Sequence, residues 1–284
     1  MPRLYRTGTD MASWVLLRGL VRESRHWGYF LNSFQNSFPE EQVLAVDLPG
    51  NGCNHRMTSP TSIANMVEAT RAIVQAHGVS EPCKVLAVSM GGMIATQWAR
   101  RYPSELAAQV LVNTSMRPFS TFTERLRPAN YGRILRLAMG GFEPSHTEQT
   151  ILDMTSNQQH PHLLSDWVQW RRESPVSASN ALRQLWAASR YRGPLHQPSV
   201  PTLLLGSEQD RLVSVACSKA ISSAWGAELR LHPSAGHDLP LDDGAWVIRQ
   251  IQEWMGSLGD ASDVVFGCPP APRQGFLNNH SPHG

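Results

Sequence analysis

The chain has 284 residues, of which 41% are hydrophobic, and this length suits one α/β domain that carries an inserted segment. A formal net charge of +2 gives no argument for a nucleic-acid or membrane-surface partner, and we expect neither. Residues 1–14 are polar, and no segment has the apolar length of a signal-peptide core or a membrane span, so we expect a cytoplasmic protein. The four cysteines show no C-x-x-C spacing, which favours free thiols in a reducing compartment.

The first part of the chain is predicted to alternate strands and helices. Apolar runs and helical spacing predict a short edge strand at 4–6, a buried strand at 14–17, a helix at 25–38, a strand at 43–46 and a helix from Thr61 or Ser62 to about His77. The Asp-Leu-Pro-Gly-Asn-Gly run at 47–52 supplies turn residues, so we interpret it as structural rather than catalytic.

The most informative pattern is a strand, a tight turn and a helix. The apolar run 85–88 predicts a buried strand, and residues 90–101 follow helical spacing. Ser89 lies between them, with the small residues Ala87 and Gly91 two positions before and after it. A serine on such a strained turn presents its hydroxyl at the sheet edge, and small neighbours let the strand and helix approach closely. The free amides of the helix N-terminus then point to where an oxyanion would form.

The rest of the chain returns to the same alternation after a helical interruption. We expect strands at 109–114, 202–205 and 228–231, and helices at 131–139, 148–154, 163–172, 179–188, 215–225 and 245–255. Strands that alternate with helices favour a parallel sheet covered on both faces.

The turn around Ser89 resembles the nucleophile elbow of the α/β-hydrolase fold, in which glycine usually stands where this chain has Ala87. The turn at 47–52 is also similar to a turn of that family, and the resemblance extends over about residues 14–257. It implies an α/β-hydrolase fold: a mostly parallel, doubly covered sheet with an inserted helical lid. The predicted division is a core at 1–116 and 196–257, a lid at 117–195 and a disordered tail at 258–284.

The resemblance also implies a catalytic triad. The stretch 206–213 resembles the Gly-x-x-Asp-x-x-Val loop that carries the triad acid, which implies Asp210, with Glu208 as the competing carboxylate. The Gly-His pair at His237 follows the last strand, where the family carries its base. Ser89, Asp210 and His237 occur in the chain order nucleophile, acid, base, and each follows a predicted strand, so we expect them at one sheet edge.

The oxyanion hole is implied in the same way. The family's His-Gly-x loop supplies one amide from the residue after glycine, which corresponds to Leu20, and Met90 supplies the other. Arg18 stands in place of the histidine. It could brace the loop, project into the site to bind an anionic substrate, or be a solvated strand end.

The predicted lid is rich in arginine. Between residues 117 and 192 there are ten arginines and six acidic residues, an excess of 10 − 6 = +4. This balance would suit an anionic substrate or an acidic carrier, although arginines that solvate an exposed helical face explain it too. Trp167, Trp170 and Trp186 are candidates for the lining of a substrate pocket, or they hold the lid together.

These features predict a serine hydrolase that cleaves a carboxylic ester or thioester through an acyl-enzyme, without a metal or organic cofactor. The pattern resembles small lidded bacterial esterases, including the type that removes the methyl ester of pimeloyl-carrier protein, so a small-molecule ester, anionic or carrier-bound, is the expected partner.

Two alternative functions stay open. One is a C–C hydrolase or a lyase of the same fold, of the menaquinone-pathway type, acting on a carboxylate-bearing substrate. The other is a ligand-binding protein that retains the triad. Monomer and homodimer are both compatible with the sequence.

Overall fold

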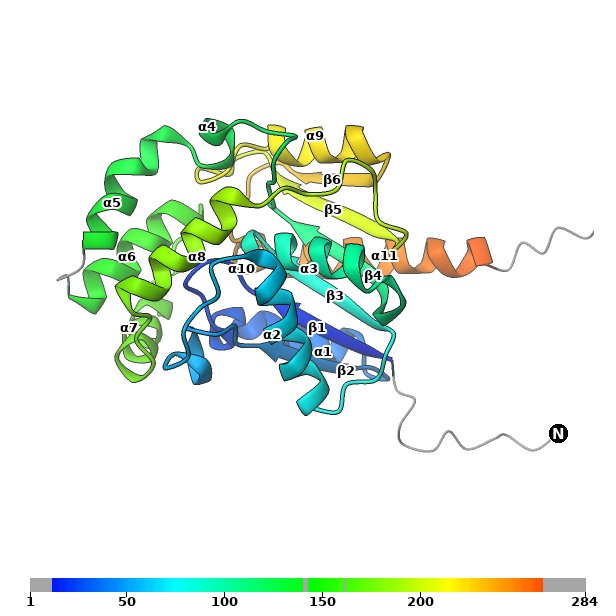
Figure 1. Ribbon diagram of the computed structural model, residues 1–284, viewed down its shortest axis with the longest axis horizontal. Helices are drawn as coiled ribbons and strands as arrows, with labels where there is room; N and C mark the ends of the chain where they lie inside the picture. The colour runs from blue at the N-terminus through cyan, green and yellow to red at the C-terminus, as the bar shows by residue number, and fades with distance from the viewer. Residues whose placement is uncertain (1–11, 140–142, 161, 263–284) are drawn as a thin grey trace, which may run out of the picture.

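The computed structural model describes residues 12–139, 143–160 and 162–262 (Figure 1). The edge strand predicted at 4–6 lies outside the described residues, as does most of the predicted tail.

The centre of the molecule is a six-stranded sheet in the order β2-β1-β3-β4-β5-β6. Every neighbouring pair of these strands is parallel. The strands are β1 (Ser13–Leu17), β2 (Gln42–Val46), β3 (Cys83–Val88), β4 (Leu106–Val112), β5 (Thr202–Ser207) and β6 (Glu228–His232). Leu17 pairs with Ala87, so the loops that follow β1 and β3 emerge side by side at the same sheet edge.

Helices cover both faces of the sheet, as the alternation of strand side chains requires. Trp14 and Leu16 of β1 pack against α1 (Tyr29–Ser37) and α11 (Gly244–Ser262). Val15 and Leu17 face the opposite core, which includes side chains from α2 (Ile63–Ala76), α3 (Met90–Arg101) and α9 (Ala216–Trp225). The doubly covered parallel sheet predicted from the sequence is therefore confirmed.

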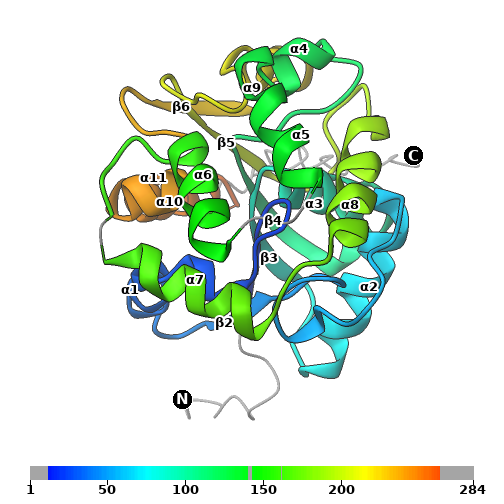
Figure 2. The same ribbon diagram turned by 90° about the vertical axis from the view of Figure 1, so that its left-hand side faces the viewer.

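Between β4 and β5, in the segment predicted to form a lid, the described residues form five α-helices. They are α4 (Phe122–Arg125), α5 (Tyr131–Met139), α6 (Pro144–Thr155), α7 (Leu163–Glu173) and α8 (Ala178–Arg190). Figures 1 and 2 show α5 to α8 gathered on one side of the molecule, beyond one end of the strands. This arrangement gives the helical segment one surface that faces the loops after the strands.

Several helix bounds differ from those predicted, two of them in ways that bear on the fold. The helix predicted at 25–38 is divided into a short 3-10 helix, Ser24–Trp27, and α1, because Gly28 has φ +52°, outside the range of a right-handed helix. At the other end of the chain, α11 continues to Ser262. The helix predicted at 245–255 therefore ends several residues later than expected. A short helix, α10 (Leu239–Asp242), was not predicted.

Candidate active site

Ser89 occupies the turn between β3 and α3 in a strained conformation. Its φ of 56° and ψ of −116° are unusual for a residue with a side chain, and such a conformation costs about 1–3 kcal/mol. A Cβ atom added to Gly91 would lie 2.6 Å from the carbonyl oxygen of Leu17 and 2.8 Å from that of Arg18. The small residue after the serine is thus required by the close approach of the β1 backbone, in agreement with the elbow pattern.

His237 and Asp210 form a buried hydrogen-bonded pair at this sheet edge. Asp210 Oδ2 accepts a hydrogen bond from His237 Nδ1 at 2.7 Å. Asp210 Oδ1 accepts the backbone N–H groups of Leu212 and Val213 at 2.8 and 2.9 Å, which fixes the carboxylate in place. Asp210 and His237 are both buried, whereas Glu208, the competing acid, is exposed. The geometry therefore favours Asp210 as the partner of the histidine.

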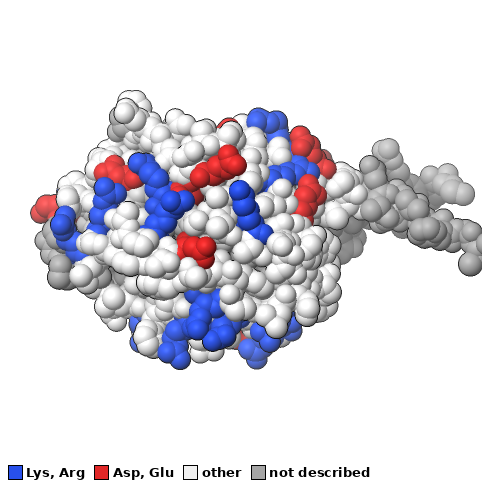
Figure 3. Space-filling model, turned by 90° about the horizontal axis from the view of Figure 1, so that it is seen from above, with Lys and Arg blue, Asp and Glu red and all other residues white. Residues whose placement is uncertain are grey.

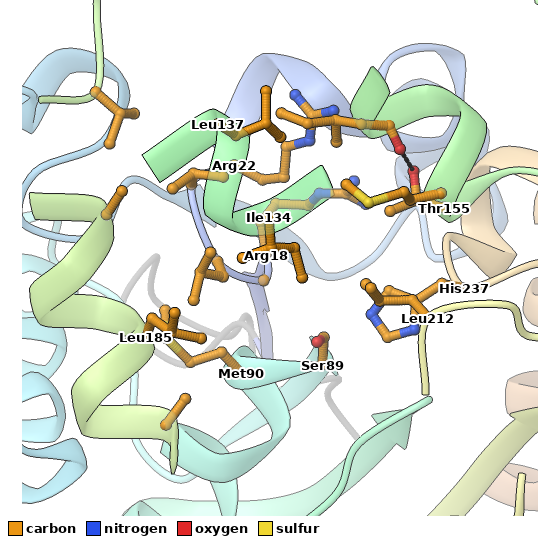
Figure 4. Close-up of a pocket in the computed structure, with 18 of the residues that line it drawn as sticks. Arg18, Arg22, Ser89, Met90, Ile134, Leu137, Thr155, Leu185, Leu212 and His237 are labelled. Carbon is orange, nitrogen blue, oxygen red and sulfur yellow. Dashed lines mark hydrogen bonds between the residues drawn. The ribbon is translucent and has the colours of Figure 1, made fainter. Parts of the chain in front are cut away.

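Ser89 and His237 both line one cavity of about 550 Å³ (Figure 4). Within the described residues the Ser89 hydroxyl makes no hydrogen bond to the imidazole, and such bonds often tighten only when substrate is bound. The structure brings together the three residues of the predicted triad: two at the cavity wall, and Asp210 directly behind His237.

The two predicted oxyanion donors are close to the serine. Met90 follows it at the start of α3, and Leu20 lies in the turn after β1; both line the cavity. A Cβ atom on Gly19 would be 3.1 Å from Ser89 Cβ, so this turn is in direct contact with the serine. In the described part of the chain, neither the Leu20 nor the Met90 N–H donates to another backbone group. Two backbone donors are therefore free beside Ser89.

Arg18 is buried, so it is not a solvated strand end. Its guanidinium makes a bidentate ion pair with Asp238; Nη1 donates to Oδ1 at 3.0 Å, and Nη2 donates to Oδ2. The ring of Trp27 lies 4.8 Å from the guanidinium carbon. Asp238 N also donates to the carbonyl oxygen of Thr155, at the end of α6, at 2.7 Å. Arg18 thus ties the turn after β1 to the loop of His237, and this pairing was not predicted.

Asn113 is a second residue that sequence reasoning missed. It follows β4 with φ +46°, a conformation that asparagine tolerates better than most residues. Its Nδ2 donates to the His237 carbonyl oxygen at 2.8 Å, and its Oδ1 accepts the Ser207 N–H at 2.8 Å. An asparagine directly after a strand that neighbours the elbow strand was the available signal. It holds the histidine loop against β5.

The three tryptophans proposed to line a substrate pocket are not among the residues of this cavity. Trp167 is buried and packs against Arg22 and His26. Trp170 also contacts His26, whereas Trp186 is 54% exposed. The aromatic-lining prediction is thus corrected, because helical spacing could not show which face of α7 or α8 turns toward the cavity. Aliphatic side chains from α5, α6 and α8 line it instead, among them Ile134, Leu137, Ile151, Met154, Leu182 and Leu185.

Burial and nearby charges shift the pKa values of His237 and Asp238. Burial opposes protonation of His237, but the carboxylates of Asp210 and, to a smaller extent, Asp238 together outweigh it and raise the pKa of the imidazole above its ordinary value. Burial also opposes ionisation of Asp238, yet the Arg18 guanidinium lowers the pKa of this carboxyl group. His237 is therefore a stronger base than a free histidine.

The described residues also limit the kind of site this can be. The described residues contain no group of three or more His, Cys, Asp and Glu side chains that could hold a metal ion. No helix among them combines the length and apolar character needed to cross a membrane. Figure 3 shows that Lys and Arg on the face seen from above fall into separate groups instead of one continuous basic surface.

The fold and this site are those of an α/β protein built around a serine on a strand–helix elbow. The family model described as alpha/beta hydrolase fold matches residues 15–244, and the chain belongs to that family. It is 24% identical over 263 residues to a pimeloyl-[acyl-carrier protein] methyl ester esterase of Xylella fastidiosa, covering 86% of this chain and 95% of the relative. It is 23% identical over 227 residues to a Cronobacter turicensis protein named as carbamate hydrolase RutD, covering 78% and 83%.

Solved structures show the same fold. An esterase from Exiguobacterium antarcticum superposes with a TM-score of 0.72 at 15% identity, covering 86% of this chain and 92% of that chain. A thermophilic esterase from Thermogutta terrifontis gives a TM-score of 0.68 at 19% identity, covering 87% and 90%. At these identities the likeness concerns the fold alone.

Proposed function

We propose that this protein is a serine hydrolase that cleaves a carboxylic ester or thioester. The observation that carries the proposal is the 2.7 Å hydrogen bond from His237 Nδ1 to Asp210, made by a histidine that shares a cavity with Ser89 on its strained elbow. The names of the relatives, an esterase and a carbamate hydrolase, support hydrolysis at a carbonyl carbon.

The mechanism follows from the roles of these groups. His237 Nε2 takes the Ser89 proton, while Asp210 holds the proton on Nδ1 and stabilises the imidazolium. Ser89 attacks the carbonyl carbon, and the N–H groups of Leu20 and Met90 stabilise the oxyanion, each by about 3 kcal/mol. The protonated His237 gives its proton to the leaving group. Water activated by His237 then hydrolyses the acyl-enzyme.

Residues 117–195 are proposed to act as a lid. Their helices supply much of the aliphatic wall of the cavity, which suits the hydrocarbon part of an acyl group. Among the described residues, most of this wall is aliphatic, which favours a flexible aliphatic chain over a planar substrate.

A second candidate reaction has one observation in its favour. Five arginines of the described residues contribute to the cavity wall, and a C–C hydrolase or lyase that acts on a carboxylate-bearing substrate would use such cationic groups. An ester and a β-diketone acid can be compared directly with the purified protein. If the protein turns over only the diketone, C–C cleavage replaces ester hydrolysis as its proposed reaction.

Steady-state hydrolysis of a series of ester and thioester substrates tests the proposal. We expect turnover by the wild type and a loss of about 10⁶-fold in kcat for Ser89→Ala, as removal of a catalytic serine causes. Tight binding of an ester without turnover would favour the ligand-binding alternative instead.

A further inference from the structure

The charges that line the cavity are strongly unbalanced. Five arginines, Arg18, Arg22, Arg125, Arg171 and Arg172, contribute to its wall, while Asp238 is the one carboxylate there within the described residues. Buried charge is costly unless it is paired, so each arginine needs an account of what compensates it.

Three of these arginines are accounted for. Arg18 is matched by Asp238. Arg125 is buried, and its guanidinium donates to the carbonyl oxygens of Ala188 and Ser189 at 2.6 and 3.0 Å, close to the negative end of α8. Arg172 is exposed, so water solvates it.

Arg22 and Arg171 share a single carboxylate. Glu148 on α6 accepts from Arg22 Nη1 at 2.6 Å through one oxygen and from Arg171 Nε through the other. Arg22 is 7% exposed and Glu148 is 1% exposed. Although burial opposes its ionisation, the two arginines lower the pKa of Glu148, so the carboxyl group is charged. Two cations and one anion leave 2 − 1 = +1 beside the cavity.

The groups that line the cavity do not cancel this excess charge, and Glu23 and Glu173, which pair with Arg25 nearby, do not line it. Glu148 does not line the main cavity; it lies behind Arg22 and Arg171 and borders a small hollow on their other side. His26 contacts Arg22, and burial lowers the pKa of its imidazole well below the ordinary value, so it stays neutral. The Nη2 atom of Arg22 is buried and has no hydrogen-bond partner within the described residues.

Arg171 makes this charge accessible to a ligand. Its side chain is 17% exposed and lines the cavity, and the one partner of its guanidinium in the described part of the chain is Glu148, through Nε. Figure 4 shows Arg22 on the far side of Arg18 from Ser89, with aliphatic side chains around the space between them. The cavity thus has a reactive end at Ser89 and a positively charged end at Arg22 and Arg171.

We propose that Arg171 and Arg22 form an anion subsite that binds a carboxylate at the far end of the substrate's aliphatic acyl chain. This proposal rests on the proposed hydrolase function and narrows its substrate to esters that are also anions. The carboxylate would balance the excess charge, and its hydrocarbon chain would lie along Ile134, Leu137 and Leu185.

Matched substrate pairs test this directly. Each pair consists of the monomethyl ester of a linear dicarboxylic acid, from succinate to azelate, and the methyl ester of the monocarboxylic acid of equal chain length. A charged hydrogen bond contributes about 1.5–3 kcal/mol, so at the best chain length we expect kcat/KM to be roughly ten- to a hundredfold higher for the anionic ester. Equal or higher values for the neutral ester at every length would overturn the proposal.

The substitution Arg171→Gln tests whether this arginine forms part of the anion subsite. It leaves Arg22 and Glu148 as a one-to-one pair, so the excess charge disappears, and the ratio of kcat/KM between anionic and neutral esters should fall about tenfold. Arg133→Gln is the matched control, since it removes an exposed arginine on α5 that does not line the cavity; it should keep the wild-type ratio. An unchanged ratio in Arg171→Gln would assign the preference to another group and contradict this site.

A binding measurement separates this proposal from the hydrolase function. Monomethyl adipate is titrated calorimetrically into Ser89→Ala and into the double variant Ser89→Ala/Arg171→Gln. Binding that is lost in the double variant supports the anion subsite even if no ester is hydrolysed by the wild type. Equal binding to both variants argues against the subsite even if hydrolysis is established.

Discussion

Arg18 and Asp238 are 220 positions apart in the chain, yet they form a bidentate ion pair buried beside the candidate active site. Arg18 begins the turn that carries Leu20, and Asp238 follows His237. The pair therefore joins the loop of one proposed oxyanion donor to the loop of the proposed base, and sets their relative position.

Removing one charge of this ion pair should destabilise the protein more than removing both charges. Asp238→Asn leaves the Arg18 guanidinium buried without its counter-charge, and we expect the free energy of unfolding to fall by about 3–5 kcal/mol in urea denaturation. The double variant Arg18→Met/Asp238→Leu removes both charges and should recover most of this stability. A single variant as stable as the wild type would show that the pair is not formed in solution.

His237 predicts the pH dependence of activity. A general base must be neutral, and its pKa is raised, so kcat/KM should increase with pH with a midpoint above the ordinary histidine value of about 6.5. The same shift stabilises the folded protein below the unfolded-state pKa, and this contribution is lost as pH rises through the folded-state pKa. A midpoint below the ordinary value would contradict the pairing with Asp210.

The identity of the acid is tested by two substitutions. Asp210→Asn should lower kcat by about 10⁴-fold, because the amide no longer stabilises the productive tautomer and the imidazolium. Glu208→Gln changes an exposed carboxyl group and should leave kcat near the wild-type value. The reverse pattern of activities would assign the acid to Glu208.

Gly91 predicts a steric effect at the elbow. In Gly91→Ala the new methyl group meets the backbone oxygens of Leu17 and Arg18, so we expect a loss of about 1–3 kcal/mol in unfolding free energy, with reduced kcat. Gly256→Ala is the control: it lies in α11 with no atom within 4 Å of the added Cβ, and it should be neutral or stabilising by up to about 1 kcal/mol. Thermal and urea denaturation compare the two variants.

Asn113 is expected to position the base. Asn113→Gly keeps a residue that adopts positive φ readily but removes the hydrogen bond to the His237 carbonyl, so kcat should fall more than KM rises. Asn113→Ala adds the strain of positive φ and should be less stable than the glycine variant. Equal kcat in wild type and Asn113→Gly would leave the asparagine a purely structural role.

Local patterns in the sequence predicted the sheet and the elbow, because strand and helix periods and the small residues around Ser89 act over short distances. The choice of Asp210 over Glu208 followed from the resemblance of residues 206–213 to the family's acid loop, and the exposure of Glu208 agrees with it. The Arg18–Asp238 pair could not be predicted, since it depends on the reach of side chains from two loops that only the folded sheet brings together. Of the two alternatives for the tryptophans on α7 and α8, the pocket lining was wrong for a similar reason: spacing does not show which helix face turns inward.

The most direct test of the account is the intact mass of the protein after incubation with a fluorophosphonate. We predict a single covalent adduct on the wild type, none on Ser89→Ala, and much slower labelling of His237→Ala, because the serine depends on this base. A folded wild-type protein that remains unmodified, or an adduct of equal extent on Ser89→Ala, would contradict the assignment of Ser89 as an activated nucleophile.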